Sequence, residues 1–192
     1  MLHLNTQEVV LSIEKSPLEI NHGILYQKYP NFFGNTFDFD FDKKENFEKL
    51  ENQTHLNRVK LSKHDIDMKK LTVFFMNSSI TQALEKKFNT KLTFDSADVW
   101  MDGKGYKLVP HVDDARIKLH LQVYLSDDNE GTSLYTPSGE LLYTFPFKAN
   151  FGYALYNNVY SYHGVEEIEK DGRISLYARY SEWGIGKIIS KQ

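Results

Sequence analysis

Residues 116–125 read RIKLHLQVYL, an unbroken alternation of polar and apolar side chains. Successive side chains of a β-strand point to opposite faces, so this stretch predicts a strand with one aliphatic face. Two interpretations of the polar face stay open, a surface exposed to water or the lining of a polar cavity. The polar face consists of Arg116, Lys118, His120, Gln122 and Tyr124.

Six further segments of the C-terminal half have the composition of strands: residues 93–101, 108–113, 133–135, 151–156, 161–165 and 173–180. Turn-forming residues separate them, for example at 102–105 and 170–172. Short strands with regular turns are typical of a β-sandwich or a jelly roll. We therefore expect a mostly β fold with flanking N-terminal helices.

A helix is predicted after residue 77, because Asn77, Ser78 and Ser79 can each cap a first turn. Its apolar side chains share one face at helical spacing, and Asn89 is its expected end. These apolar residues are Ile80, Ala83, Leu84 and Phe88. We expect the helix to pack against the sheet.

The stretch FDFDFD at residues 37–42 alternates strictly and superficially fits the start of a calcium-binding loop. No glycine follows Asp42, and the twelfth position of such a loop, counted from Asp38, is Lys49 instead of a glutamate. An edge strand or a solvated loop is the expected structure.

The chain has 192 residues, enough for one hydrophobic core. We expect a single domain, with residues 1–91 as a mixed support region and residues 92–183 as the β core. The absence of cysteine excludes disulfides, zinc ribbons, iron–sulfur clusters and cysteine nucleophiles. A net charge of -3 argues against a nucleic-acid partner. The sequence lacks the pattern of a signal peptide and of a membrane span, which predicts a cytoplasmic protein with no membrane association.

Three side chains with metal-binding chemistry lie in the β half. His111 and Asp113 are two residues apart on a predicted strand, where alternate side chains share a face, and His163 lies in another β-like segment. Ligands of this kind suit iron, manganese or zinc. Two histidines and one carboxylate form the facial triad typical of non-haem iron(II) oxygenases. Taken alone, this pattern is a weak signal.

Ten residues after His163, Arg173 and Ser175 form a second pair on one side of a predicted strand. A planar guanidinium offers paired donors that match a carboxylate, and a nearby hydroxyl can add a hydrogen bond. A dicarboxylate that chelates a metal through a keto group and one carboxylate holds its other carboxylate some distance away. An arginine at a fixed offset from a metal-binding histidine fits such a co-substrate, so the whole pattern is specific.

If the polar face of residues 116–125 lines a cavity, Tyr124 is placed to donate its hydroxyl to the co-substrate carboxylate beside Arg173. His120 lies nine residues from His111 on a different strand, with no carboxylate at a recognised spacing. We expect a hydrogen-bonded or substrate-side histidine there, not a metal ligand. Asp114 is interpreted as a turn residue.

These residues resemble the 2-oxoglutarate/Fe(II)-dependent dioxygenase superfamily, and within it the small prolyl-hydroxylase-like enzymes. The resemblance covers about residues 99–183 and rests on GYKLVPHVD at 105–113, VYLSDD at 123–128, GTSL at 131–134, HGV at 163–165 and Arg173-x-Ser175. Residues 130–132 read EGT where the family usually has a Gly-Gly pair.

The resemblance implies a double-stranded β-helix, which is a jelly roll, and a hydroxylase that uses Fe(II), 2-oxoglutarate and dioxygen. The implied iron ligands are His111, Asp113 and His163, with no catalytic side chain beyond this metal centre. The implied binders of the C5 carboxylate of 2-oxoglutarate are Arg173 and Ser175, with Tyr124 as a helper. The substrate would be a small molecule or a peptide, and Arg-x-Ser argues against a protein prolyl substrate.

Two other classes of protein are alternatives. One is a cupin-like metal-dependent enzyme without 2-oxoglutarate, which would need His and Glu ligands in another order and gives Arg173 and Ser175 no role. The other is a non-catalytic β-sandwich binding module in which His111 and His163 are incidental.

Overall fold

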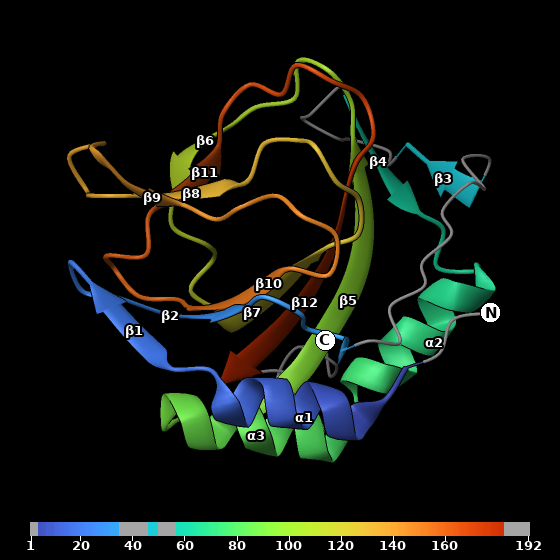
Figure 1. Cartoon of the computed structure of the whole chain (residues 1–192), viewed down its shortest axis with the longest axis vertical. Helices are drawn as coiled ribbons and strands as arrows, with labels where there is room; N and C mark the ends of the chain where they lie inside the picture. Colours follow the sequence, from blue (N-terminus) through green and yellow to red (C-terminus); the bar gives the residue numbers. More distant parts are fainter. Residues whose placement is uncertain (1–3, 35–45, 50–56, 183–192) are drawn as a thin grey trace, which may run out of the picture.

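Two antiparallel β-sheets face each other, and helices cover the outer side of the larger sheet (Figure 1). The computed structural model describes residues 4–34, 46–49 and 57–182. Its strands are β1 (Leu18–Asn21), β2 (Ile24–Tyr29), β3 (Phe47–Glu48), β4 (Arg58–Leu61), β5 (Leu92–Asp102), β6 (Leu108–His111), β7 (Ile117–Tyr124), β8 (Thr132–Tyr135), β9 (Leu141–Thr144), β10 (Gly152–Tyr156), β11 (His163–Val165) and β12 (Arg173–Glu182).

The large sheet has the strand order β1-β2-β10-β7-β12-β5-β4-β3, and the small sheet has the order β6-β11-β8-β9. From β5 onward the chain passes repeatedly from one sheet to the other. The seven strands predicted from the sequence are confirmed as β5, β6, β7, β8, β10, β11 and β12. The strand β9 and the N-terminal strands β1 to β4 were not predicted.

The N-terminal strands extend the large sheet at both edges. β2 pairs with β10 on one side, and β4 pairs with β5 on the other. Because the pairing is continuous, the region before residue 92 and the region after it share one sheet. Residues 37–42, predicted as an edge strand or solvated loop, lie outside the described residues.

The helices are α1 (Thr6–Lys15), α2 (Ile66–Phe75) and α3 (Ser78–Phe88). Each helix begins with a capping residue whose side chain accepts hydrogen bonds from backbone N–H groups. The capping residues are Asn5 for α1, Asp65 for α2 and Asn77 for α3. The predicted helix is confirmed as α3, whose end is fixed by Asn89 in the left-handed conformation at φ 48°. None of the described helices is long and apolar enough to cross a membrane.

The two faces of the large sheet differ in chemistry. The outer face packs aliphatic residues such as Leu121 and Leu176 against the helices, in a core that includes Leu71 and Leu84. Burial of each such side chain stabilises the fold by roughly 1.5–3 kcal/mol. The inner face, turned toward the small sheet, carries His120 at 1% exposure and Gln122 at 7%. The interpretation of the polar face as a surface exposed to water is therefore wrong for His120 and Gln122, whereas Arg116, at the start of the predicted strand, is exposed.

Candidate metal centre and cavity

Two histidines meet as cross-strand neighbours in the small sheet. His111 ends β6 and His163 begins β11, and the two residues are paired in the antiparallel register. Their ring centroids are 4.5 Å apart. The strands approach closely at Gly164, where a Cβ atom would lie 2.5 Å from the carbonyl oxygen of Leu108. A glycine at this position therefore permits the pairing that brings the imidazoles together.

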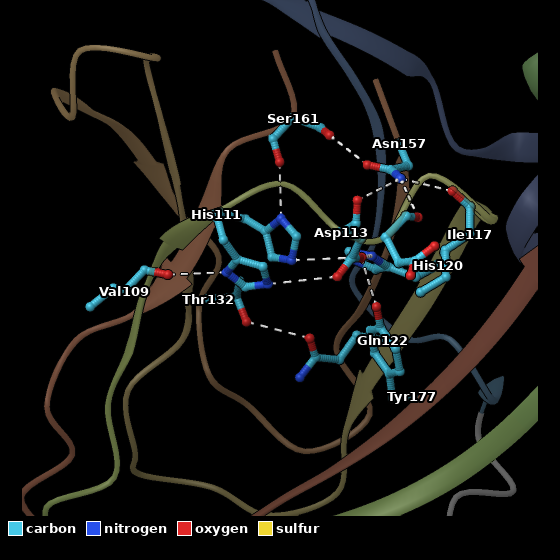
Figure 2. Close-up of polar contacts among 12 residues, drawn as sticks. Val109, His111, Asp113, Ile117, His120, Gln122, Thr132, Asn157, Ser161 and Tyr177 are labelled. Carbon is cyan, nitrogen blue, oxygen red and sulfur yellow. Dashed lines mark hydrogen bonds and ion pairs between the residues drawn. The ribbon is translucent and has the colours of Figure 1, made fainter. Parts of the chain in front are cut away.

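The main chain orients both imidazoles. His111 Nδ1 lies 3.0 Å from the carbonyl oxygen of Val109, and His163 Nδ1 lies 2.9 Å from that of Ser161. A carbonyl oxygen only accepts hydrogen bonds, so each Nδ1 carries a proton, and in the neutral imidazole each Nε2 keeps its lone pair. Figure 2 shows the contact between His111 and Val109. This is the tautomer that binds a metal through Nε2.

Asp113 reaches the same point from a loop. β6 ends at His111, so the predicted strand continuing to Asp113 is wrong, and strand alternation does not explain the shared direction. The loop is instead held by the Asn157 side-chain amide, which donates to the carbonyl oxygens of Asp113, Asp114 and Ile117 at 2.8–3.3 Å. Hydrogen bonds from Asn157, which is 44 residues away in the sequence, thus replace the strand as the positioning element.

Two side chains of the large sheet hold the Asp113 carboxylate. His120 Nδ1 lies 2.7 Å from Oδ2, and the Tyr177 hydroxyl donates to the same oxygen at 2.8 Å (Figure 2). Asp113 Oδ1 is therefore the oxygen left for a metal, 3.6 Å from His111 Nε2. His120 is therefore hydrogen-bonded to Asp113, and a hydrogen-bonded histidine was one of the two roles expected for it. Its Nε2 has no hydrogen-bond partner among the described residues.

The electrostatics of the site keep the carboxylate charged. Burial acts to raise the pKa of Asp113, but its contacts with His111 and His120 and the charges of the nearby imidazoles outweigh burial and hold the pKa well below its usual range. Burial, together with His120, lowers the pKa of His163 to about 4. The contact with Asp113 raises the pKa of His111. A charged carboxylate beside a neutral His163 is the protonation state that metal binding requires.

His111, Asp113 and His163 together could hold a metal ion, since one ligand atom from each lies within 4.8 Å of the others. The set offers two neutral nitrogen donors and one anionic oxygen donor. These donors suit a divalent transition metal such as iron, and three ligands leave part of an octahedral shell open. The chemistry of these three donors therefore fits the Fe(II) ion that the sequence predicted.

A cavity of about 230 Å³ extends from these three residues between the two sheets. Arg173 and Ser175 line its wall, as do Gln122 and Thr132. The expected metal ligands and the expected anion-binding pair thus border one cavity, although they come from different sheets.

Arg173 has no exposed surface and lies among fixed partners. Its Nη1 donates to Asp102 at 2.7 Å, its Nε donates to the carbonyl oxygen of Glu130 at 2.7 Å, and its Nη2 lies 3.4 Å from Thr132 Oγ1. Three of the five guanidinium N–H groups are thus accounted for. Ser175 Oγ, on the same wall, is buried without a hydrogen-bond partner among the described residues. A buried unpaired hydroxyl is costly, and a ligand that accepts its hydrogen bond removes the cost.

Tyr124 lies behind Arg173 and does not line this cavity. Its ring centroid is 5.7 Å from the guanidinium carbon of Arg173, and its hydroxyl accepts the backbone N–H of Thr132 at 2.8 Å. Tyr124 therefore lies next to Arg173, and its hydroxyl is hydrogen-bonded to the backbone of β8 and not directed into the cavity.

The other polar residues of β7 separate into two groups. Gln122 lines the cavity, and its Oε1 accepts a hydrogen bond from the Tyr153 hydroxyl. Lys118 instead lies over the ring of Tyr156, and the exposed Arg116 pairs with Asp114 at 2.9 Å. Asp114 is thus a loop residue, as expected.

Solved structures provide the comparison with known proteins. A prolyl 4-hydroxylase from Phytophthora capsici has a TM-score of 0.67 at 15% identity, over 96% of this chain and 68% of that chain. HygX from Streptomyces hygroscopicus, solved with nickel and 2-oxoglutarate bound, has a TM-score of 0.61 at 12% identity, over 83% of both chains. A 2OG-Fe(II) oxygenase family oxidoreductase from Burkholderia pseudomallei has a TM-score of 0.52 at 13% identity, over 90% of this chain and 75% of that chain.

The fold is that of the 2-oxoglutarate/Fe(II) oxygenases. The resemblance stated from the sequence motifs is therefore supported by structures that share few residues with this chain. No protein-family model matches the sequence, and no curated protein is similar to it.

Several polar residues on the inner face of this oxygenase fold were not predicted from the sequence. On β12, Tyr177 and Arg179 continue the alternation that begins with Arg173 and Ser175, so the signal was present in the strand pattern. On β5, Asp98 and Asp102 alternate with apolar residues in the same way, but their arginine partners lie 81 and 71 residues away in sequence. Only the fold brings those pairs together.

Proposed function

We propose that this protein is a non-haem Fe(II)- and 2-oxoglutarate-dependent dioxygenase that hydroxylates a C–H bond of a small molecule or a peptide. The observation that carries the proposal is the shared cavity. A candidate metal centre of two histidines and one aspartate borders the same space as a buried arginine and a buried serine hydroxyl that has no partner in the described part of the chain.

We also infer that the two sheets form a jelly roll, the double-stranded β-helix. The eight strands from β5 to β12 divide equally between the sheets, four in each, and antiparallel pairing runs throughout. A jelly roll consists of eight strands in two such sheets. The orders β10-β7-β12-β5 and β6-β11-β8-β9 support this assignment.

His111, Asp113 and His163 would hold the Fe(II) ion. The hydrogen bonds from each histidine Nδ1 to a carbonyl fix the rings with Nε2 toward the ion. His120 and Tyr177 hold Asp113 Oδ2 and leave Oδ1 for coordination. Since these partners are already in place, little reorganisation is needed when a metal binds.

Arg173 and Ser175 would bind the C5 carboxylate of 2-oxoglutarate. The guanidinium matches a carboxylate in charge and geometry, and the Ser175 hydroxyl would donate a further hydrogen bond. Tyr124 would support the arginine by contact with its guanidinium. HygX, which shares the fold, was solved with 2-oxoglutarate and nickel bound, which supports the pairing of a metal with this co-substrate.

When bound, Fe(II) with 2-oxoglutarate supplies the oxidising chemistry, in which dioxygen and a C–H bond give a hydroxyl group while the co-substrate becomes succinate and carbon dioxide. The chain itself binds and orients the reactants. Arg173 fixes the far end of the co-substrate, and the close-packed aromatic rings of Phe145 and Tyr153, 4.0 Å apart, exclude water behind Gln122.

The two alternatives explain fewer observations. A cupin-like enzyme without 2-oxoglutarate gives no role to a buried arginine and an unpaired serine on the cavity wall. A non-catalytic binding module does not account for two histidine rings oriented by carbonyl groups around an aspartate. A cytoplasmic location and the absence of nucleic-acid and membrane partners stay predictions.

Formation of succinate tests the proposal. The purified protein with Fe(II), ascorbate, dioxygen and 2-oxoglutarate is expected to produce succinate, and omission of Fe(II) is expected to stop it. His163→Ala and Arg173→Gln are each expected to lower the rate by at least about tenfold, since each removes a charged or metal-directed contact.

Arg116→Gln is the matched control, because Arg116 also pairs with an aspartate but lies outside the cavity. Its succinate formation should equal that of the wild type. Succinate formation that persists in both His163→Ala and Arg173→Gln would contradict the proposed function.

A further inference from the structure

Three charged residues on the inner face of the large sheet form a cluster that includes Arg173, the proposed co-substrate arginine. Asp102 of β5 contacts Arg58 of β4 at 2.7 Å and Arg173 of β12 at 2.7 Å. These residues are direct neighbours in the strand register. We call this cluster the first triad.

A second triad of the same design lies further along the same three strands. Asp98 of β5 contacts Lys60 of β4 at 2.6 Å and Arg179 of β12 at 2.8 Å. Asp98 is buried, whereas the side chains of Lys60 and Arg179 are 25% and 32% exposed. The second triad is thus closer to solvent than the first.

The second triad has one carboxylate and two cationic side chains, and therefore one positive charge in excess among these three residues. In the first triad, the C5 carboxylate of 2-oxoglutarate would bind at Arg173. The proposed function assigns no anion to the second triad. A partly buried charge without a counter-ion is unfavourable, so an anionic ligand would stabilise it.

Arg179 is already oriented to receive such a ligand. Its Nε donates to Ser96 Oγ at 2.9 Å and its Nη2 donates to Asp98 Oδ2 at 2.8 Å. Its Nη1 has no hydrogen-bond partner among the described residues, and the side chain lines the cavity. Because two bonds already fix the guanidinium, binding a ligand costs little further side-chain entropy.

The position of Arg179 relative to the metal centre fits a primary substrate. Arg173, Ser175, Tyr177 and Arg179 follow one another on the inner face of β12, and Tyr177 bonds the metal-ligand candidate Asp113. Two residues of a strand span roughly 6.6 Å. Arg179 therefore lies one such step beyond Tyr177, on the side away from the co-substrate arginine.

We propose that Arg179 binds a single anionic group of the primary substrate, which makes the substrate a small monocarboxylic acid or an equivalent monoanion. The assignment of this anion to a substrate rests on the proposed function, whereas anion binding at the second triad does not. The indole of Trp100 lines the same cavity, and Lys60 of the second triad lies over its ring at 5.4 Å. The cavity of about 230 Å³ is smaller than the roughly 300–1,000 Å³ of sites for drug-sized ligands, which favours a small molecule.

Matched pairs of acids and amides test this inference. Butanoate, benzoate, phenylacetate and indole-3-acetate, each with its primary amide, are titrated into the protein loaded with Ni(II) and 2-oxoglutarate, and binding is measured by calorimetry. We expect at least one acid to bind with about tenfold or greater preference over its amide, since only the acid carries the charge that pairs with Arg179.

Arg179→Gln is expected to abolish the preference for the acid, and Arg116→Gln is expected to retain it. Lys60→Gln is a second variant, which keeps Arg179 but removes the excess charge, and acid affinity should fall several-fold. The inference is overturned if no acid binds better than its amide, or if the preference for the acid is unchanged in Arg179→Gln.

The same titrations without Ni(II) and 2-oxoglutarate separate this inference from the proposed function. The second triad contains no metal-ligand candidate, so the difference between wild type and Arg179→Gln in the preference for the acid should persist in the metal-free protein. A protein that prefers acids but forms no succinate would contradict the proposed function alone. A protein that forms succinate but shows no such preference would contradict the inference about Arg179 alone.

Discussion

The small sheet and the inner face of the large sheet hold their polar side chains in different ways. In the small sheet, His111 and His163 each donate to a carbonyl group two residues earlier in the chain. In the large sheet, Arg173 and Arg179 depend on aspartates 71 and 81 residues away. The two histidines of the candidate metal centre are therefore locally oriented, whereas Arg173 and Arg179 are oriented only by the assembled fold.

This difference assigns separate tasks to the sheets. The small sheet provides two imidazoles that could bind a metal, and the large sheet provides positive charges compensated in part by buried carboxylates. Asp113 joins the two, because it lies in the loop after β6 and accepts hydrogen bonds from His120 and Tyr177 of the large sheet. Variants on either side of this junction should therefore affect different properties.

The largest expected effect is loss of metal binding on the small-sheet side. His163→Ala removes a buried nitrogen ligand, and Ni(II) affinity should fall by more than about a hundredfold, beyond the roughly 10–100-fold typical of residues that only orient ligands. His64→Ala, a change of an exposed histidine outside the site, is the control. Equal Ni(II) affinity of the two variants in equilibrium dialysis would contradict the assignment.

On the large-sheet side, the expected effect is on stability. Asp102→Asn leaves the cations of Arg58 and Arg173 without their carboxylate in a fully buried position, and the free energy of unfolding should fall by about 3–5 kcal/mol. Asp98→Asn should cost less, because its two partners are partly exposed. Urea denaturation measures both, and an equal loss in the two variants would show that the triads do not differ in burial as described.

A smaller effect is expected at the junction. Tyr177→Phe removes one hydrogen bond to Asp113 Oδ2 while His120 remains, so Ni(II) affinity should fall by about tenfold. Tyr180→Phe is a matched control, because Tyr180 lies on the opposite face of β12 and its hydroxyl bonds the carbonyl oxygen of Phe75. If both variants bind Ni(II) like the wild type, Tyr177 does not position the ligand.

The same contrast explains what could be predicted from the sequence. The strands of the β core and helix α3 were found because alternation and helical spacing are local properties of the chain. The helices α1 and α2 were missed as individual elements, because the mixed composition before residue 77 gives no single clear period. The roles of His111, Asp113, His163 and Arg173 were predicted from their order and spacing and stay predictions, although the structure places all four residues around one cavity.

Long-range features could not be predicted in this way. Asp113 was expected on a strand and lies in a loop fixed by Asn157, a residue 44 positions away. Tyr124 was expected in the cavity, whereas its hydroxyl bonds the amide of Thr132 on another strand. Asp98 and Asp102 carry no signal until β5 is placed beside β12. Each of these depends on pairings that the fold creates.

The central claim is that one molecule, 2-oxoglutarate, contacts the metal centre of the small sheet and Arg173 of the large sheet. The most direct test compares 2-oxoglutarate with 2-oxobutanoate, which has the same chelating end but no far carboxylate. Calorimetry measures both ligands with Ni(II)-loaded wild type, Arg173→Gln and the control Arg116→Gln.

We expect wild type and Arg116→Gln to prefer 2-oxoglutarate by about tenfold or more, and Arg173→Gln to bind the two ligands alike, because the guanidinium interacts only with the far carboxylate. Equal affinity of the wild type for both ligands, or an unchanged preference in Arg173→Gln, would contradict the claim.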